Sequence, residues 1–136
     1  MSSCRWCQRT EESLVMIRIL YVDDEADLRE IAAMSLELDP ELEVKTVASG
    51  AEAVEQAKQW QPAIILLDVM MPGMDGPATL AALGMDPATQ AIPVVFITAK
   101  THPRQVNDLK ALGACAVLAK PFDPMTLAAT VRTLFR

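Results

Sequence analysis

Residues 63–67 (AIILL), which Asp68 follows directly, decide the fold that this sequence predicts. Five apolar residues in a row, without polar alternation, are typical of a strand buried on both faces in a parallel sheet that helices cover. Residues 92–97 (IPVVFI) repeat the pattern, and Thr98 follows them. Two strands of this kind indicate the centre of a parallel sheet with helices on both sides.

Strands and helices are expected to alternate along the rest of the chain. Further strands are predicted at residues 17–22 (IRILYV), 42–47 (LEVKTV) and 116–119 (AVLA). Helices are predicted over residues 25–38, from the capping box of Ser49 and Glu52 to about Trp60, from Asp75 onward, over 103–113, and from the capping pair Asp123 and Pro124 onward. A strand followed by a helix, five times over, predicts an α/β fold with a doubly wound parallel sheet.

Two of these helices carry a recognisable apolar face. The helix over 25–38 places Leu28, Ile31, Ala32, Ser35 and Leu38 on one side. The last helix is expected to bury Leu127, Val131 and Leu134.

The composition fits one globular domain with an acidic body. The chain has 136 residues, 51% of them hydrophobic, and a formal net charge of −6. An acidic surface argues against sequence-independent binding to nucleic acids or anionic membranes. The sequence shows no apolar run near the ~18 residues of a membrane span, no signal peptide and no even set of cysteines. We therefore expect a cytoplasmic protein that binds neither nucleic acid nor membrane.

Residues 1–15 show neither a strand nor a helix period, and we expect a disordered tail before one domain at residues 16–136. Cys4 and Cys7 form a CxxC pair in this tail. A zinc site would have only Cys115 and His102 as further ligands, and both belong to the other half of the chain. A redox pair would need a helix N-terminus after a strand, which the tail lacks.

Polar residues follow four of the expected strands at their carboxyl ends. These residues are Asp23 and Asp24, Asp68, Thr98, and Lys120. In an open doubly wound sheet, ligands bind beyond the carboxyl ends of the strands. Polar residues often end a strand without further role, but four such endings on one edge favour a functional site.

The residue types in this set suit phosphoryl transfer to a carboxylate. Clustered carboxylates repel one another, and a hard divalent cation such as Mg²⁺ relieves that repulsion through oxygen ligands. An aspartate can then act as the nucleophile while the cation and an ammonium group neutralise the phosphoryl oxygens. No nucleotide-binding glycine loop (GxxxxGK[ST] or GxGxxG) is present. The phosphoryl donor is therefore expected to be another protein or a small phospho-compound.

Four motifs in this order resemble the receiver domain of two-component response regulators. They are VDDE (22–25), LLDVMMPGMDG (66–76), FITA (96–99) and GACAVLAKPF (113–122). The resemblance covers about residues 16–136. It implies a flavodoxin-like fold with a five-stranded parallel sheet in the order 2-1-3-4-5.

The resemblance also implies a phosphoacceptor and a metal site. Asp68 would accept a phosphoryl group from the phosphohistidine of a sensor histidine kinase or a histidine phosphotransfer protein. Asp24 would ligate Mg²⁺ directly and Asp23 mostly through water. The Asp68 carboxylate and the backbone carbonyl of Met70 would complete the protein ligands, with Mn²⁺ as the alternative ion.

The remaining implied roles concern switching. Lys120 would pair with the phosphoryl oxygens, Thr98 would rotate to hydrogen-bond them, and the Lys120–Pro121 peptide bond would be cis. The family usually has an aromatic residue where Val117 stands, so the aromatic part of the switch is in question. A downstream target is expected on the face of the fourth helix (103–113), the fifth strand (116–119) and the fifth helix. Small or apolar residues there replace the family's usual charges: Cys115, Ala116, Val117, Ala119 and Met125.

Three functions are compatible with this sequence. The first is a single-domain response regulator, a signalling switch in a phosphorelay rather than an enzyme, since the chain ends soon after its last helix. The alternative is a pseudo-receiver that binds partners without using phosphate, which Val117 favours slightly and the complete polar set disfavours. An enzyme of flavodoxin-like fold is the third, but no flavin phosphate loop follows the first strand, where VDDEAD stands.

Overall fold

The computed structural model describes residues 17–99, 102–120 and 122–134. In this part of the chain five strands alternate with five helices: β1 (Ile17–Val22), α2 (Ala26–Leu36), β2 (Leu42–Val47), α3 (Gly50–Trp60), β3 (Ile64–Asp68), α4 (Gly76–Gly84), β4 (Val94–Thr98), α5 (Pro103–Ala111), β5 (Ala116–Ala119) and α6 (Leu127–Leu134). The tail expected at residues 1–15 and the peptide bond before Pro121 lie outside the described residues. None of the described helices is long and apolar enough to cross a membrane.

The five strands form one parallel sheet in the order β2-β1-β3-β4-β5. This order confirms the flavodoxin-like sheet that the motifs imply. Asp68 of β3 lies opposite Ile97 of β4, and Thr98 lies opposite Ala119 of β5. The carboxyl ends of these strands therefore meet at one edge of the sheet.

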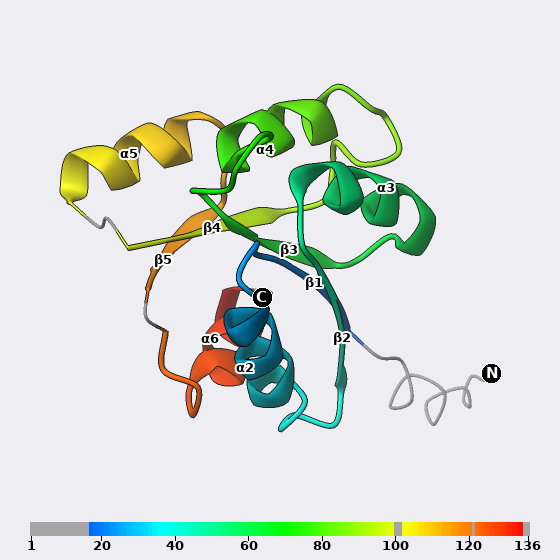
Figure 1. The fold of residues 1–136 in the computed structure, drawn as a ribbon, viewed down its shortest axis with the longest axis vertical. Helices are drawn as coiled ribbons and strands as arrows, with labels where there is room; N and C mark the ends of the chain where they lie inside the picture. The colour runs from blue at the N-terminus through cyan, green and yellow to red at the C-terminus, as the bar shows by residue number, and fades with distance from the viewer. Residues whose placement is uncertain (1–16, 100–101, 121, 135–136) are drawn as a thin grey trace, which may run out of the picture.

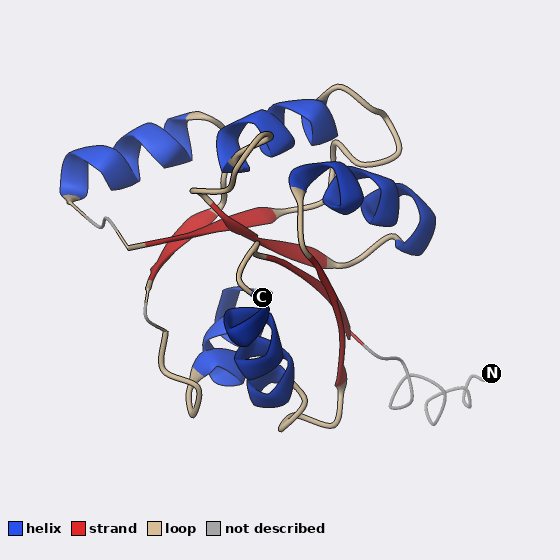
Figure 2. Ribbon diagram, in the orientation of Figure 1, coloured by secondary structure: helices blue, strands red, loops and turns tan. Residues whose placement is uncertain are grey.

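Helices cover both faces of the sheet, and the core is divided accordingly. Helices α3, α4 and α5 lie on one side, and α2 and α6 lie on the other (Figure 1). Figure 2 shows the strands as a single twisted layer between them. Alternate residues of β1 enter different cores: Leu20 and Val22 pack with α3 and α4, whereas Ile19 and Tyr21 pack with α2 and α6.

Every residue of β3 and β4 is buried, as expected for central strands of a covered parallel sheet. Both strands end at the polar residue that the sequence predicts, although they begin one and two residues later, at Ile64 and Val94. Asp68 and Thr98 are their last residues. The sheet's backbone hydrogen bonds therefore fix the position of both side chains.

Capping residues begin α3 and α4 where the sequence predicts. The Ser49 hydroxyl accepts a hydrogen bond from the Glu52 backbone N–H at 3.2 Å, and the Asp75 carboxylate accepts one from Ala78 at 2.9 Å. The Glu52 carboxylate accepts from the backbone N–H of Ala48 at 2.9 Å, one residue before the cap.

The apolar face predicted for residues 25–38 is partly wrong. Ala32 and Ser35 are buried, but Ile31 is 40% exposed and Leu38 is 65% exposed. Leu36, which the prediction omits, is fully buried. The helix ends at Leu36, so Leu38 lies beyond it and cannot share its buried face.

The predicted start of the last helix is also wrong. Asp123 caps a turn, because its carboxylate accepts a hydrogen bond from the Met125 N–H at 2.9 Å and its carbonyl accepts one from the Thr126 N–H at 3.1 Å. The helix begins only at Leu127. Leu127 and Val131 are buried as predicted, and Leu134 is partly buried.

Candidate functional site

Three aspartates meet at the carboxyl edge of the sheet. Carboxylate oxygens of Asp23, Asp24 and Asp68 all lie within 4.8 Å of one another. Asp23 and Asp24 follow β1, and Asp68 ends the neighbouring strand β3. Asp23 and Asp68 are buried, whereas Asp24 is exposed. The sequence predicts that these three residues lie together, and the structure confirms this arrangement.

A close backbone approach at Gly76 shapes the loop after β3. The Gly76 N–H donates to the carbonyl of Val69 at 2.9 Å, which closes the loop into a compact turn. A Cβ atom at Gly76 would lie 2.7 Å from the Asp68 carbonyl oxygen, closer than real Cβ atoms come to such an atom. Only glycine allows this turn to pack against the end of β3.

Lys120 connects the two buried aspartates. Its Nζ lies 3.1 Å from Asp23 Oδ2 and 3.2 Å from Asp68 Oδ1, and it also lies 4.0 Å from Glu25 Oε1. The Lys120 backbone N–H donates to the Thr98 carbonyl at 2.8 Å, which holds the end of β5 against β4. One ammonium group thus partly neutralises two buried carboxylates.

The three carboxylates of the site carry more negative charge than the single ammonium group of Lys120 can neutralise. Burial, and after it the charge of Asp23, raise the pKa of Asp68 to about 6, because Lys120 and the Met70 backbone N–H offset these two effects only in part. Burial lowers the pKa of Lys120, but hydrogen bonds and charges from Asp23 and Asp68 outweigh burial and raise it overall. A bound divalent cation would favour the ionised form of Asp68.

Asp24 and Asp68 line a hollow of about 260 Å³, which is large enough for a hydrated cation and a phosphoryl group. Its lining residues are Asp24, Glu25, Asp68, Met70, Ala99 and Lys120. Mg²⁺ prefers oxygen ligands and retains several waters, so an open site with clustered carboxylates fits it. The residues present therefore fit the implied metal, and Met70 lines the same hollow.

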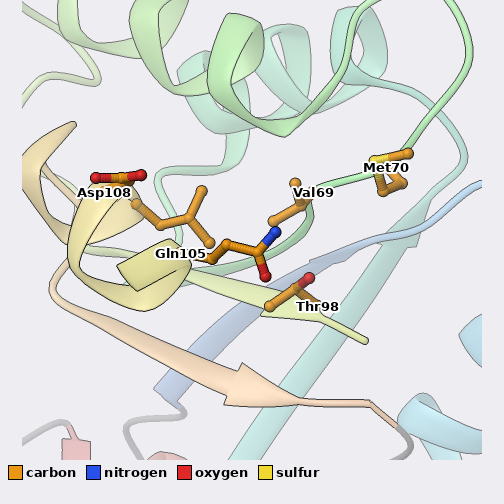
Figure 3. Close-up of a pocket in the computed structure, with 6 residues that line it drawn as sticks. Val69, Met70, Thr98, Gln105 and Asp108 are labelled. Atoms are coloured by element: carbon orange, nitrogen blue, oxygen red, sulfur yellow. The ribbon is translucent and has the colours of Figure 1, made fainter. Parts of the chain in front are cut away.

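Thr98 lies at the same edge but on the other face of the sheet. It follows Phe96 by two residues and so faces α3, α4 and α5. It lines a second hollow of about 230 Å³ with Val69, Met70, Gln105, Asp108 and Leu109 (Figure 3). Figure 3 shows the Gln105 side chain pointing from α5 toward Thr98. Met70 lines both hollows, so they are neighbours.

Sequence reasoning missed two residues of the site. The buried Tyr21 donates its hydroxyl to Asp23 Oδ2 at 3.0 Å, and Glu25 lies near Lys120. The signal for Tyr21 was its spacing, since residues two apart in a strand face the same side. No spacing rule pointed to Glu25, because it lies in the turn between β1 and α2.

The expected output surface is not a continuous apolar face. Met125 lies against α2 instead, lining a hollow of about 210 Å³ with Ile31, Met34, Ser35, Leu38 and Pro124. Ala116 and Val117 are half-buried and pack on opposite cores. The exposed positions of α5 are mostly polar or charged. Cys115 and Ala119 remain as exposed small residues at β5.

Comparisons with known proteins agree with this geometry. The family model of the response regulator receiver domain matches residues 19–132. Response regulator Rre1 of Synechocystis sp. is 38% identical over 118 residues, which cover 87% of this chain and 51% of Rre1. Response regulator PleD of Caulobacter vibrioides is 46% identical over 122 residues, which cover 88% of this chain and 26% of PleD. The chain therefore spans about half or less of these two relatives.

A solved structure of similar size matches as well. The chemotaxis response regulator CheY4 of Vibrio cholerae superposes with a TM-score of 0.81 at 34% sequence identity. The match covers 88% of this chain and 99% of CheY4.

Proposed function

The chain belongs to the response regulator receiver domain family, whose members are phosphoacceptor signalling switches, and from this premise we propose that Asp68 is its phosphoacceptor in a Mg²⁺-dependent reaction. The observation that carries the proposal is the grouping of Asp23, Asp24, Asp68 and Lys120 at one edge of the sheet. The complete set also disfavours the alternative, a pseudo-receiver that binds partners without phosphate.

Each residue has a proposed part in the transfer. An Asp68 carboxylate oxygen attacks the phosphorus atom, the bond from phosphorus to the donor imidazole nitrogen breaks, and the electron pair stays on that nitrogen. Asp23, Asp24, Asp68 and the Met70 carbonyl would hold Mg²⁺ or Mn²⁺, which when bound supplies positive charge for the phosphoryl oxygens. Lys120, whose Nζ lies 3.2 Å from Asp68 Oδ1, supplies a second positive charge. With its pKa at about 6, Asp68 is ionised near neutral pH and ready to attack.

Thr98 is proposed as the residue that transmits phosphorylation. Its hydroxyl would turn toward the phosphoryl group and leave the hollow that it shares with Gln105 and Asp108. Since α5 buries none of its residues, it can adjust to that change at little cost. We propose that a downstream protein recognises the altered surface of α5, β5 and α6.

The phosphodonor is proposed to be a sensor histidine kinase or a histidine phosphotransfer protein. It must cover the hollow over Asp68, whose rim includes Glu25 directly before α2. Farther along, α2 exposes Ile31 and Met34, and Leu38, just after the end of the helix, and Met125 line the same hollow with them. We propose this α2 surface as the place where the donor docks. A cytoplasmic location and action without an attached output domain remain predictions.

The proposed function is tested by phosphorylation with acetyl phosphate. The wild-type chain should gain the mass of one phosphoryl group in Mg²⁺ and none in EDTA, and Asp68→Asn should gain none. Asp86→Asn, at a distant aspartate paired with Lys58, serves as the matched control and should be labelled normally. Intact mass spectrometry gives the measurement. Labelling that survives Asp68→Asn, or that is unaffected by EDTA, would refute the assignment, and no labelling of the wild type would favour the pseudo-receiver.

A further inference from the structure

Tyr21 is a buried hydroxyl group placed directly behind the metal site. It is the only tyrosine of the chain and has no exposed surface. Its hydroxyl donates to Asp23 Oδ2 at 3.0 Å. The ring packs edge-on against Phe122, with ring centroids 6.3 Å apart. Both ends of the side chain are therefore fixed, one by packing and the other by a carboxylate of the site.

The Asp23 carboxylate is held by three separate donors. Its Oδ2 accepts from the Tyr21 hydroxyl at 3.0 Å and lies 3.1 Å from Lys120 Nζ. Its Oδ1 accepts from the backbone N–H of Glu25 at 3.0 Å. Tyr21 and Lys120 therefore contact the same carboxylate oxygen. Without the hydroxyl, Lys120 would be the one side-chain donor to the Asp23 carboxylate among the described contacts, since Arg29 donates to the Asp23 backbone carbonyl.

We propose that Tyr21 is a positioning residue for the divalent cation and acts through Asp23. The hydroxyl limits the rotation of the carboxylate and so keeps it in the orientation that groups with Asp24 and Asp68. Groups that hydrogen-bond a metal ligand from behind typically contribute roughly 10–100-fold to metal affinity. This inference rests on the proposed Mg²⁺-dependent function of the site.

The test is Mg²⁺ binding by Tyr21→Phe, measured by titration calorimetry on the full chain. This variant removes the hydroxyl and keeps the ring that packs against Phe122. The Mg²⁺ dissociation constant should rise roughly tenfold or more. Ile19→Val is the matched control, because it trims a buried side chain on the same face of β1 and leaves the contacts of Asp23 intact. It should bind Mg²⁺ within about twofold of the wild type.

A spectroscopic measurement separates positioning from a loss of packing. Replacing tyrosine by 3-fluorotyrosine labels Tyr21 alone, so the protein gives one fluorine resonance. Mg²⁺ should shift this resonance in the wild type, and Asp23→Asn should abolish the shift. The inference is overturned if Tyr21→Phe binds Mg²⁺ as tightly as the wild type, or if Ile19→Val weakens Mg²⁺ binding as much as Tyr21→Phe does. It is also overturned if Mg²⁺ does not shift the fluorine resonance of the wild type.

Phosphorylation by acetyl phosphate distinguishes this inference from the proposed function. Tyr21→Phe should require at least tenfold more Mg²⁺ for half-maximal labelling and reach the wild-type rate once Mg²⁺ is saturating. A wild type that binds Mg²⁺ but is never labelled would refute the proposed function, and the ratio of dissociation constants would still decide the role of Tyr21.

Discussion

The buried carboxylate of Asp68 destabilises the metal-free fold as long as it is ionised. Burial and the neighbouring Asp23 raise its pKa from 3.8 to about 6. The folded state therefore holds a proton more tightly than the unfolded state does. The stabilisation that the protonated Asp68 provides is fully present below about pH 4. It falls as the pH rises toward 6 and is absent above that value. The difference across this window is limited to about 3 kcal/mol.

Removing this charge should stabilise the metal-free protein. In EDTA at pH 7.5, we expect Asp68→Asn to raise the free energy of unfolding by up to about 3 kcal/mol, because the charge of Asp68 no longer has to be desolvated beside Asp23. The gain should shrink steadily below pH 6 and vanish near pH 4. Urea unfolding at several pH values gives the measurement.

A surface aspartate provides a control of opposite sign. The Ala88 backbone N–H and Lys58 lower the pKa of Asp86, so its contribution is present at neutral pH and lost as the pH falls. Asp86→Asn should therefore lower stability at pH 7.5 and have less effect in acid. If Asp68→Asn is no more stable than the wild type at pH 7.5, the charge of Asp68 is compensated in the folded state.

Some of these residues were predictable from the sequence, and others were not. Asp23, Asp68 and Lys120 each follow an apolar run, and parallel strands bring such residues to one edge whatever the details of packing. The hydrogen bond from Tyr21 to Asp23 depends on the direction of a hydroxyl inside the core. The alternation of side chains along a strand predicts that two residues share a face of the sheet, but it does not predict a hydrogen bond between them.

At the scale of the elements, α2 and the turn after it expose large apolar side chains that the core does not bury. Met34 is 64% exposed, Leu38 is 65% exposed, and Met125 beside them is 79% exposed. The apolar period of residues 25–38 predicted the helix correctly but not its orientation. Packing of α2 against α6 and β2 selects Ala32, Ser35 and Leu36 for burial, and a period alone cannot identify those partners.

If a phosphodonor docks on α2, a charge on this surface should block it. We expect Met34→Glu to slow phosphotransfer from the cognate kinase or phosphotransfer protein at least tenfold, because the carboxylate would have to be desolvated against an apolar partner. Labelling by acetyl phosphate should not change, since that donor needs no docking surface. The two rates are compared with purified donor protein and with the small molecule.

Another exposed methionine offers the matched control for this prediction. Met85 is 83% exposed and lies at the C-terminal end of α4, away from the α2 surface. Met85→Glu introduces the same charge and should leave both rates at the wild-type level. Equal slowing by the two variants would mean that net charge, and not the α2 surface, controls docking.

At the scale of the whole molecule, folding concentrates negative charge at one edge of an acidic protein. The net charge is −6, and three carboxylates are gathered within 4.8 Å of one another, two of them paired with Lys120. The unfolded chain separates Asp68 from Asp23 and Asp24 by more than forty residues. It therefore lacks the site, and a divalent cation should bind the folded state in preference.

Mg²⁺ should consequently raise the melting temperature of the whole domain. At a concentration 100 times the dissociation constant, preferential binding contributes about 2.7 kcal/mol, which corresponds to a rise of several degrees. Differential scanning calorimetry over a Mg²⁺ series gives the measurement, with KCl at matched ionic strength to separate binding from screening. Asp24→Asn should abolish most of the rise, because the exposed Asp24 is the ligand proposed to contact the ion directly. An equal rise in this variant, or in KCl alone, would show that the cation acts on the overall charge and not at the three aspartates.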